Sequence, residues 1–105
     1  MTKKTRYIPP SEVISPKRSW TLIKVLYDEG KSDQGNARAS VALGKWGKDP
    51  VLAMRWNGDE ENNTIGNPQS RGLPTWFIVP KHFRDALVGT LPKQQQMLAK
   101  SVFEK

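Results

Sequence analysis

The sequence of 105 residues contains no cysteine, one histidine and no long hydrophobic run. The lack of cysteine excludes disulfides, thiolate catalysis and cysteine-ligated zinc. No segment approaches the roughly 20 apolar residues of a membrane span. The opening Met1-Thr-Lys-Lys is not followed by the apolar stretch of a secretory signal. We therefore expect a single intracellular domain.

Acidic side chains are scarce relative to basic ones. Ten Asp and Glu stand against seventeen Lys and Arg, which gives a formal net charge of +7. Such an excess favours a polyanionic partner, and nucleic acid is the commonest polyanion inside cells. Composition alone is equally consistent with a basic protein whose charge serves only to keep it soluble.

Groups that could carry catalysis are few. Asp59, Glu60 and Glu61 form the one carboxylate cluster, and they are adjacent in an asparagine-rich stretch. Neighbouring carboxylates in a flexible loop make a poor octahedral Mg²⁺ site, so we interpret them as a solvated acidic loop. His82 has no candidate nucleophile or orienting acid nearby in the sequence. The sequence predicts no enzyme, no metal and no cofactor.

The pattern along the chain predicts an α+β fold. Residues 1–18 carry three prolines and five basic residues against one acidic residue, which is typical of a flexible basic arm. Strand-like runs follow at 20–28, 39–46, 51–57 and 75–79. Pro80 suits the first turn of a helix with an apolar stripe of Phe83, Leu87 and Leu91. We expect a four-stranded antiparallel sheet and a C-terminal helix in residues 19–91, then a helical tail in residues 92–105.

Alternation along the strands assigns side chains to two faces of this sheet. One face is wholly apolar and suits cover by the helix; it collects Ile23, Val25, Val41, Leu43, Leu52, Met54, Phe77 and Val79. Tyr27 and Trp56 fall on this same face, and we interpret Trp56 as structural. The other face collects Trp20, Lys24, Trp46, Arg55 and Trp76 among the small residues Ser40, Ala42, Gly44 and Ala53.

Aromatic and cationic side chains on one open face favour binding of a single-stranded nucleic acid. Bases stack on indoles while Lys and Arg follow the phosphates. Lys45 and Lys48 would add a basic patch at the hairpin. Alternatively, the tryptophans pack against a second subunit or at the edges of the core. Arg71, in a glycine-proline loop before the last strand, is either a phosphate contact or a solvated turn residue.

The last two strands resemble those of a known family. A third strand of the type V-L-I-x-I-R is matched by Val51-Leu52-Ala53-Met54-Arg55. The basic end of the following loop is matched by Arg71-Gly72. The last strand and the helix start are matched by Trp76-Phe77-Ile78-Val79-Pro80 with Phe83. This pattern, over about residues 19–91, resembles the single-stranded-DNA-binding family of the transcriptional coactivator positive cofactor four, in a bacterial or phage member. The chain departs from it in the extra Leu73-Pro74, in a single loop arginine and in the tail after Leu91.

The resemblance implies a homodimer whose helices meet and whose curved sheets guide unpaired DNA, with Arg55 and Arg71 as phosphate contacts. It also implies a place in the cytoplasm, at the nucleoid or in a phage-infected host. We therefore expect single-stranded DNA binding with little sequence preference, in transcription or in replication and recombination at melted DNA. A protein-interaction module that uses the tryptophan-rich face is the alternative. The expected DNA-binding residues are Trp20, Lys24, Lys45, Trp46, Lys48, Arg55, Arg71 and Trp76.

Overall fold

The structure is a computed structural model, and it describes residues 7–33, 35–61 and 63–104. A four-stranded antiparallel sheet has the order β1-β2-β3-β6. Its strands are β1 (Trp20–Asp28), β2 (Ala39–Trp46), β3 (Asp49–Trp56) and β6 (Phe77–Ile78). The smaller elements are the 3₁₀ helix η1 (Pro10–Glu12), the strands β4 (Gln69–Ser70) and β5 (Leu73–Pro74), and the helices α1 (Lys81–Val88) and α2 (Lys93–Phe103).

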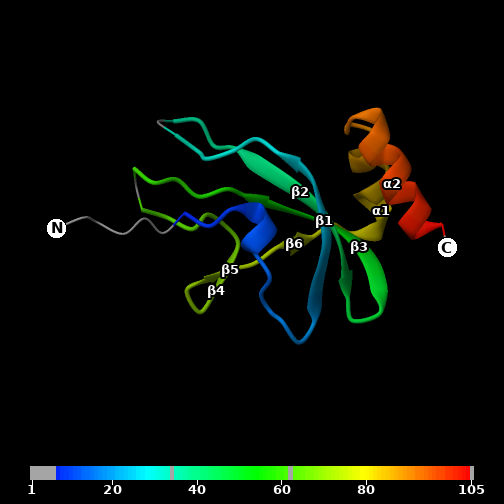
Figure 1. The fold of residues 1–105 in the computed structure, drawn as a ribbon, viewed down its shortest axis with the longest axis horizontal. Helices are drawn as coiled ribbons and strands as arrows, with labels where there is room; N and C mark the ends of the chain where they lie inside the picture. The colour runs from blue at the N-terminus through cyan, green and yellow to red at the C-terminus, as the bar shows by residue number, and fades with distance from the viewer. Residues whose placement is uncertain (1–6, 34, 62, 105) are drawn as a thin grey trace.

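The sheet separates two layers of the molecule. Figure 1 shows α1 and α2 together on one side, which we call the helix side. The N-terminal segment, residues 7–18 with η1, lies on the other side, which we call the arm side (Figure 1). No helix in the described ranges is long and apolar enough to cross a membrane.

The sequence predicted most of this architecture. The four-stranded antiparallel sheet followed by C-terminal helices is confirmed, and the bounds of β1 and β2 agree with the prediction. The expectation of a curved sheet is wrong, because the sheet is not curled. The β4–β5 hairpin was not predicted, and β6 is shorter than the expected run 75–79.

The helix-side core forms where the alternating apolar residues of the strands meet the apolar stripes of the helices. Pro80 and Pro92 each stand directly before a helix, where a missing N–H costs little. The buried members of this core are Leu26, Val41, Leu43, Leu52, Val79, Val88, Leu91 and Ala99. Leu87, Leu98, Val102 and Phe103 pack against them from the helices.

A second core lies on the arm side. Its buried members are Val13, Trp20, Ala42, Ala53 and Trp76. Trp20 lies so close to β2 that a Cβ added to Gly44 would stand 2.2 Å from the Trp20 ring, so only glycine fits there. The N-terminal segment therefore completes the fold where we had expected a flexible arm; residues 1–6 of that arm lie outside the described residues.

Two register shifts in β1 change which face its side chains reach. They lie between Leu22 and Lys24 and between Val25 and Tyr27. Lys24 consequently pairs with Leu43, and Tyr27 pairs with Val41, both of which belong to the helix-side core. Because directly opposed residues of an antiparallel pair point to the same face, Lys24 lies on the helix side and not, as predicted, beside Trp20. Val25, opposite Ala42, moves to the arm side.

Candidate nucleic-acid interface

The sheet face that we expected to be open is covered. Trp76 is 7% exposed and its indole Nε1–H donates to the carbonyl oxygen of Val13 at 2.7 Å. Trp20 is buried beside it, with 6.0 Å between the two ring centroids. The prediction that both tryptophans lie on an open surface is therefore wrong: the N-terminal segment occupies the space that a base would need. A stacking role for them stays a prediction that requires this segment to move away.

Arg55 is also buried, at 2% exposure. Its guanidinium donates to the carbonyl oxygen of Ile65 and, at 2.5 Å, to that of Thr75, so it ties two loops to β3. Desolvation lowers the pKa of Arg55 to about 10, which leaves the group charged at neutral pH. As a direct phosphate contact, Arg55 would have to release both carbonyls.

The other predicted residues are exposed but do not form one surface. Lys45, Trp46 and Lys48 lie at the β2–β3 hairpin, where Trp46 is 44% exposed. Arg71 and Gly72 have φ values of 51° and 81° between β4 and β5, as in a type I′ turn. Arg71 there lines a hollow with Lys17 on the N-terminal segment. Contacts of these residues and of Lys24 with DNA stay predictions.

A different surface, on the helix side, is open and aromatic. Tyr27, Val41, Met54 and Phe77 are paired in one row across β1, β2, β3 and β6. The next row along the strands pairs Ala39 with Trp56, two residues beyond Met54 on the same face. We call Tyr27, Met54, Trp56 and Phe77 the aromatic strip.

The helices do not cover the aromatic strip. Trp56 and Phe77 are each 53% exposed, and Tyr27 is 42% exposed. Figure 1 shows α1 and α2 at one end of the sheet, while β2 and β3 run on beyond them. Sequence reasoning assigned Tyr27 and Trp56 to the core face but did not reveal that the helices leave these two side chains of that face exposed.

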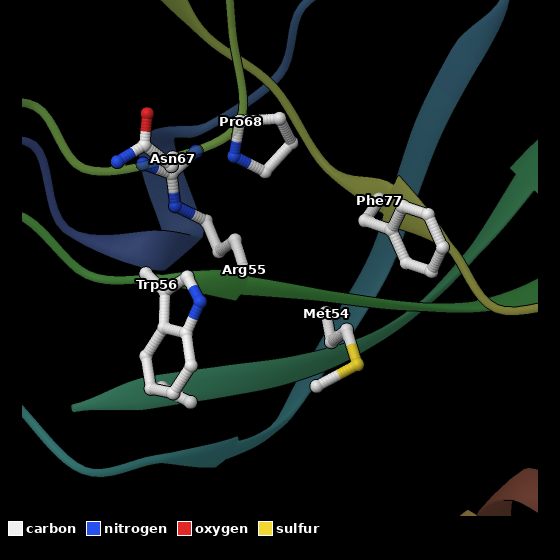
Figure 2. A pocket seen from close by; sticks show the side chains of 7 residues that line it. Met54, Arg55, Trp56, Asn67, Pro68 and Phe77 are labelled. Carbon is white, nitrogen blue, oxygen red and sulfur yellow. The ribbon is translucent and has the colours of Figure 1, made fainter. Parts of the chain in front are cut away.

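A cavity of about 290 Å³ opens beside the aromatic strip. Figure 2 shows Trp56 and Phe77 at its two ends and Met54 between them, with Arg55, Asn67 and Pro68 opposite. The backbone of Asn67 is fixed to that of Trp56 by two hydrogen bonds, N–H to carbonyl, of 2.8 and 3.1 Å. The walls of the cavity thus come from β2, β3, β6 and the loop before β4.

Glu60 of the acidic loop and His82 both make contacts at the surface. Glu60 forms an ion pair with Lys31, and His82 packs edge-on against Phe83 with ring centroids 5.1 Å apart. Within the described ranges, no three His, Cys, Asp or Glu residues are grouped so that they could hold a metal ion.

Known proteins do not assign this chain to a family. No family model matches it, and no curated protein and no solved structure matches it either. The resemblance to the positive cofactor four family therefore stays a prediction from the sequence.

Proposed function

We propose that this protein binds single-stranded DNA with little sequence preference, and that the strand lies along the aromatic strip. The single observation that carries the proposal is that three aromatic side chains of one sheet face, Tyr27, Trp56 and Phe77, are about half-exposed. Bases stack on such side chains for about 1–3 kcal/mol each, without regard to sequence.

The charge of the chain supports the same proposal. The net charge of +7 draws a polyanion to the molecule. Lys24, which is exposed on the helix side of β1, stands on the face that carries the strip. In this proposal the aromatic side chains stack on the bases, while Lys24 and the net positive charge of the chain attract the phosphates.

A protein partner is the second candidate for this surface, because Met54, Phe77 and Ala39 would also suit an apolar side chain. A partner protein does not need the positive charge, so the two candidates differ in their response to salt. A homodimer and a role at melted DNA in transcription, replication or recombination are further parts of the proposal. Light scattering of the full chain tests the dimer.

Fluorescence titration with oligo-dT tests the proposed function. We expect quenching on binding, and we expect Trp56→Ala to weaken binding by about tenfold, since it removes one stacking platform. Phe83→Ala is the control, because Phe83 is an exposed aromatic residue, at 60%, but lies on α1 and outside the strip. Equal losses in both variants would place the strand elsewhere, and an absence of binding would reject the proposal.

A further inference from the structure

A hollow of about 530 Å³ lies between the N-terminal segment and the β4–β5 hairpin, and we call it the arm-side hollow. Figure 1 shows the hairpin next to the blue N-terminal segment. Two cations line the hollow from these two walls: Lys17 belongs to the N-terminal segment, and Arg71 stands at the turn of the hairpin. The fold thus brings together two basic side chains that are far apart in the sequence.

No carboxylate balances these two cations. No Asp or Glu lines the hollow, and among the described residues neither Lys17 nor Arg71 forms an ion pair. Two like charges beside one hollow repel each other, whereas an anion between them is attracted to both. The arm-side hollow therefore favours an anionic ligand.

Hydroxyl groups add neutral donors to the same walls. Ser70 is opposed to Leu73 in the β4–β5 pair, so their side chains share one face of the hairpin, and Thr75 follows two residues after Leu73. Ser15 lines the hollow from the N-terminal segment. The hydroxyls of Ser15, Ser70 and Thr75 form no hydrogen bond with any other described residue. Each of them can therefore donate to an oxygen of a bound anion.

The backbone of both walls is already held in place. The carbonyl oxygen of Pro16 accepts a hydrogen bond from the N–H of Trp20 at 2.8 Å. In the other wall, the N–H of Thr75 donates to the carbonyl oxygen of Pro68 at 3.0 Å, and Arg55 donates to the carbonyl oxygen of Thr75 at 2.5 Å. Because these groups are engaged within the fold, binding does not have to order the walls first.

We infer that the arm-side hollow binds a phosphate group between Lys17 and Arg71. A phosphate has the negative charge that two cations require, and it has enough oxygens to accept from a guanidinium, an ammonium and several hydroxyls at once. A nucleic-acid backbone and a free phosphate both present this group, and titration distinguishes them. The inference does not rest on the aromatic strip, which lies on the other side of the sheet.

Heteronuclear NMR of the full chain tests the inference with inorganic phosphate, an abasic deoxyribose-phosphate oligomer and, as the control for ionic strength, sodium chloride. We expect phosphate and the oligomer to shift the backbone amide signals of Lys17, Ser70, Arg71 and Thr75, and we expect sodium chloride to leave them in place. The oligomer has no bases to stack on the aromatic strip, so it reports phosphate contacts alone. Tighter binding of the oligomer at these signals identifies the nucleic-acid backbone as the source of the group, and equal binding identifies free phosphate.

Lys17→Gln and Arg71→Gln probe the two cations. Each substitution removes one phosphate contact, so we expect each to weaken binding of the abasic oligomer by about fivefold. The slope of log affinity against log salt should become shallower by about 0.7 for each variant. Lys93→Gln is the matched control, since Lys93 is exposed on α2 and loses the same charge on the helix side. Screening should limit its effect to less than about twofold.

Two results would overturn the inference. One is that sodium chloride shifts the same four amides, or that phosphate and the oligomer leave them in place. The other is that Lys17→Gln and Arg71→Gln lose no more affinity than Lys93→Gln.

The proposed function fails or stands separately. If oligo-dT binding depends on Trp56 but no signal at the hollow shifts, only the inference is wrong. If the signals at the hollow shift but Trp56→Ala binds oligo-dT normally, the inference stands and the aromatic strip is not the binding surface.

Discussion

The two buried tryptophans, Trp20 and Trp76, differ in whether the indole N–H has a hydrogen-bond partner. The indole N–H of Trp76 is bonded to Val13, whereas that of Trp20 is buried and has no hydrogen-bond partner among the described residues. Leaving a buried donor or acceptor unpaired costs about 1–3 kcal/mol. Trp76 therefore fixes the N-terminal segment, and Trp20 contributes mainly through its ring, which rests on Gly44.

Replacement of each tryptophan by phenylalanine measures this difference. Both substitutions remove similar ring volume, but Trp76→Phe leaves the Val13 carbonyl without its donor, while Trp20→Phe deletes an unpaired donor. We expect Trp76→Phe to lower the free energy of unfolding by about 1–2 kcal/mol more than Trp20→Phe, as measured by urea denaturation. Unchanged stability of Trp76→Phe together with lost DNA binding would instead support the role that the sequence predicted for Trp76.

At the scale of elements, the N-terminal segment behaves as a third layer of the fold. Val13 is fully buried, and Pro10 is among the largest fully buried side chains. The basic residues Lys17 and Arg18 of the same segment remain exposed. The segment therefore packs against the sheet through its buried apolar residues and presents its basic residues to solvent.

Val13→Asp tests this anchor. An unpaired carboxylate in the arm-side core should lower the free energy of unfolding by about 3 kcal/mol or more, with a red shift of tryptophan emission as Trp20 and Trp76 become hydrated. Ile14→Asp is the control, because Ile14 is 43% exposed, and its effect should stay within about 0.5 kcal/mol. Equal stability of the two variants would mean that the segment does not hold the sheet.

On the scale of the whole molecule, the exposed basic residues and the aromatic strip lie in different places. The aromatic strip lies on the helix side, whereas Arg71 and Lys17 gather on the arm side. Lys45 and Lys48 stand at a third place, the β2–β3 hairpin. We therefore expect the net charge to attract a strand from many directions and the strip to decide where its bases bind.

Salt titration measures the charge contribution. If about four phosphates are neutralised, the logarithm of the affinity for oligo-dT should fall with a slope near −2.8 against the logarithm of the salt concentration. This corresponds to a roughly 50-fold loss between about 50 and about 200 mM salt. An affinity that does not change with salt would contradict the DNA proposal and favour an apolar protein partner.

Much of the fold was determined by the sequence itself. Alternation placed β1 and β2 at their observed bounds, and Pro80 and Pro92 marked the helix starts, because these signals are local. Alternation also placed Val41, Leu43 and Leu52 in the helix-side core. The basic excess, and with it the expectation of a polyanionic partner, also follows from composition alone.

Only the tertiary structure decided which surface is free. The N-terminal segment covers Trp76 through a contact between residues 63 apart in the sequence, the Trp76–Val13 hydrogen bond, and no local pattern encodes such a contact. The register shifts in β1 moved Lys24 to the other face, since one extra residue reverses the alternation. The helices pack at one end of the sheet and leave Trp56 and Phe77 exposed, and where a helix docks on a sheet is a tertiary property.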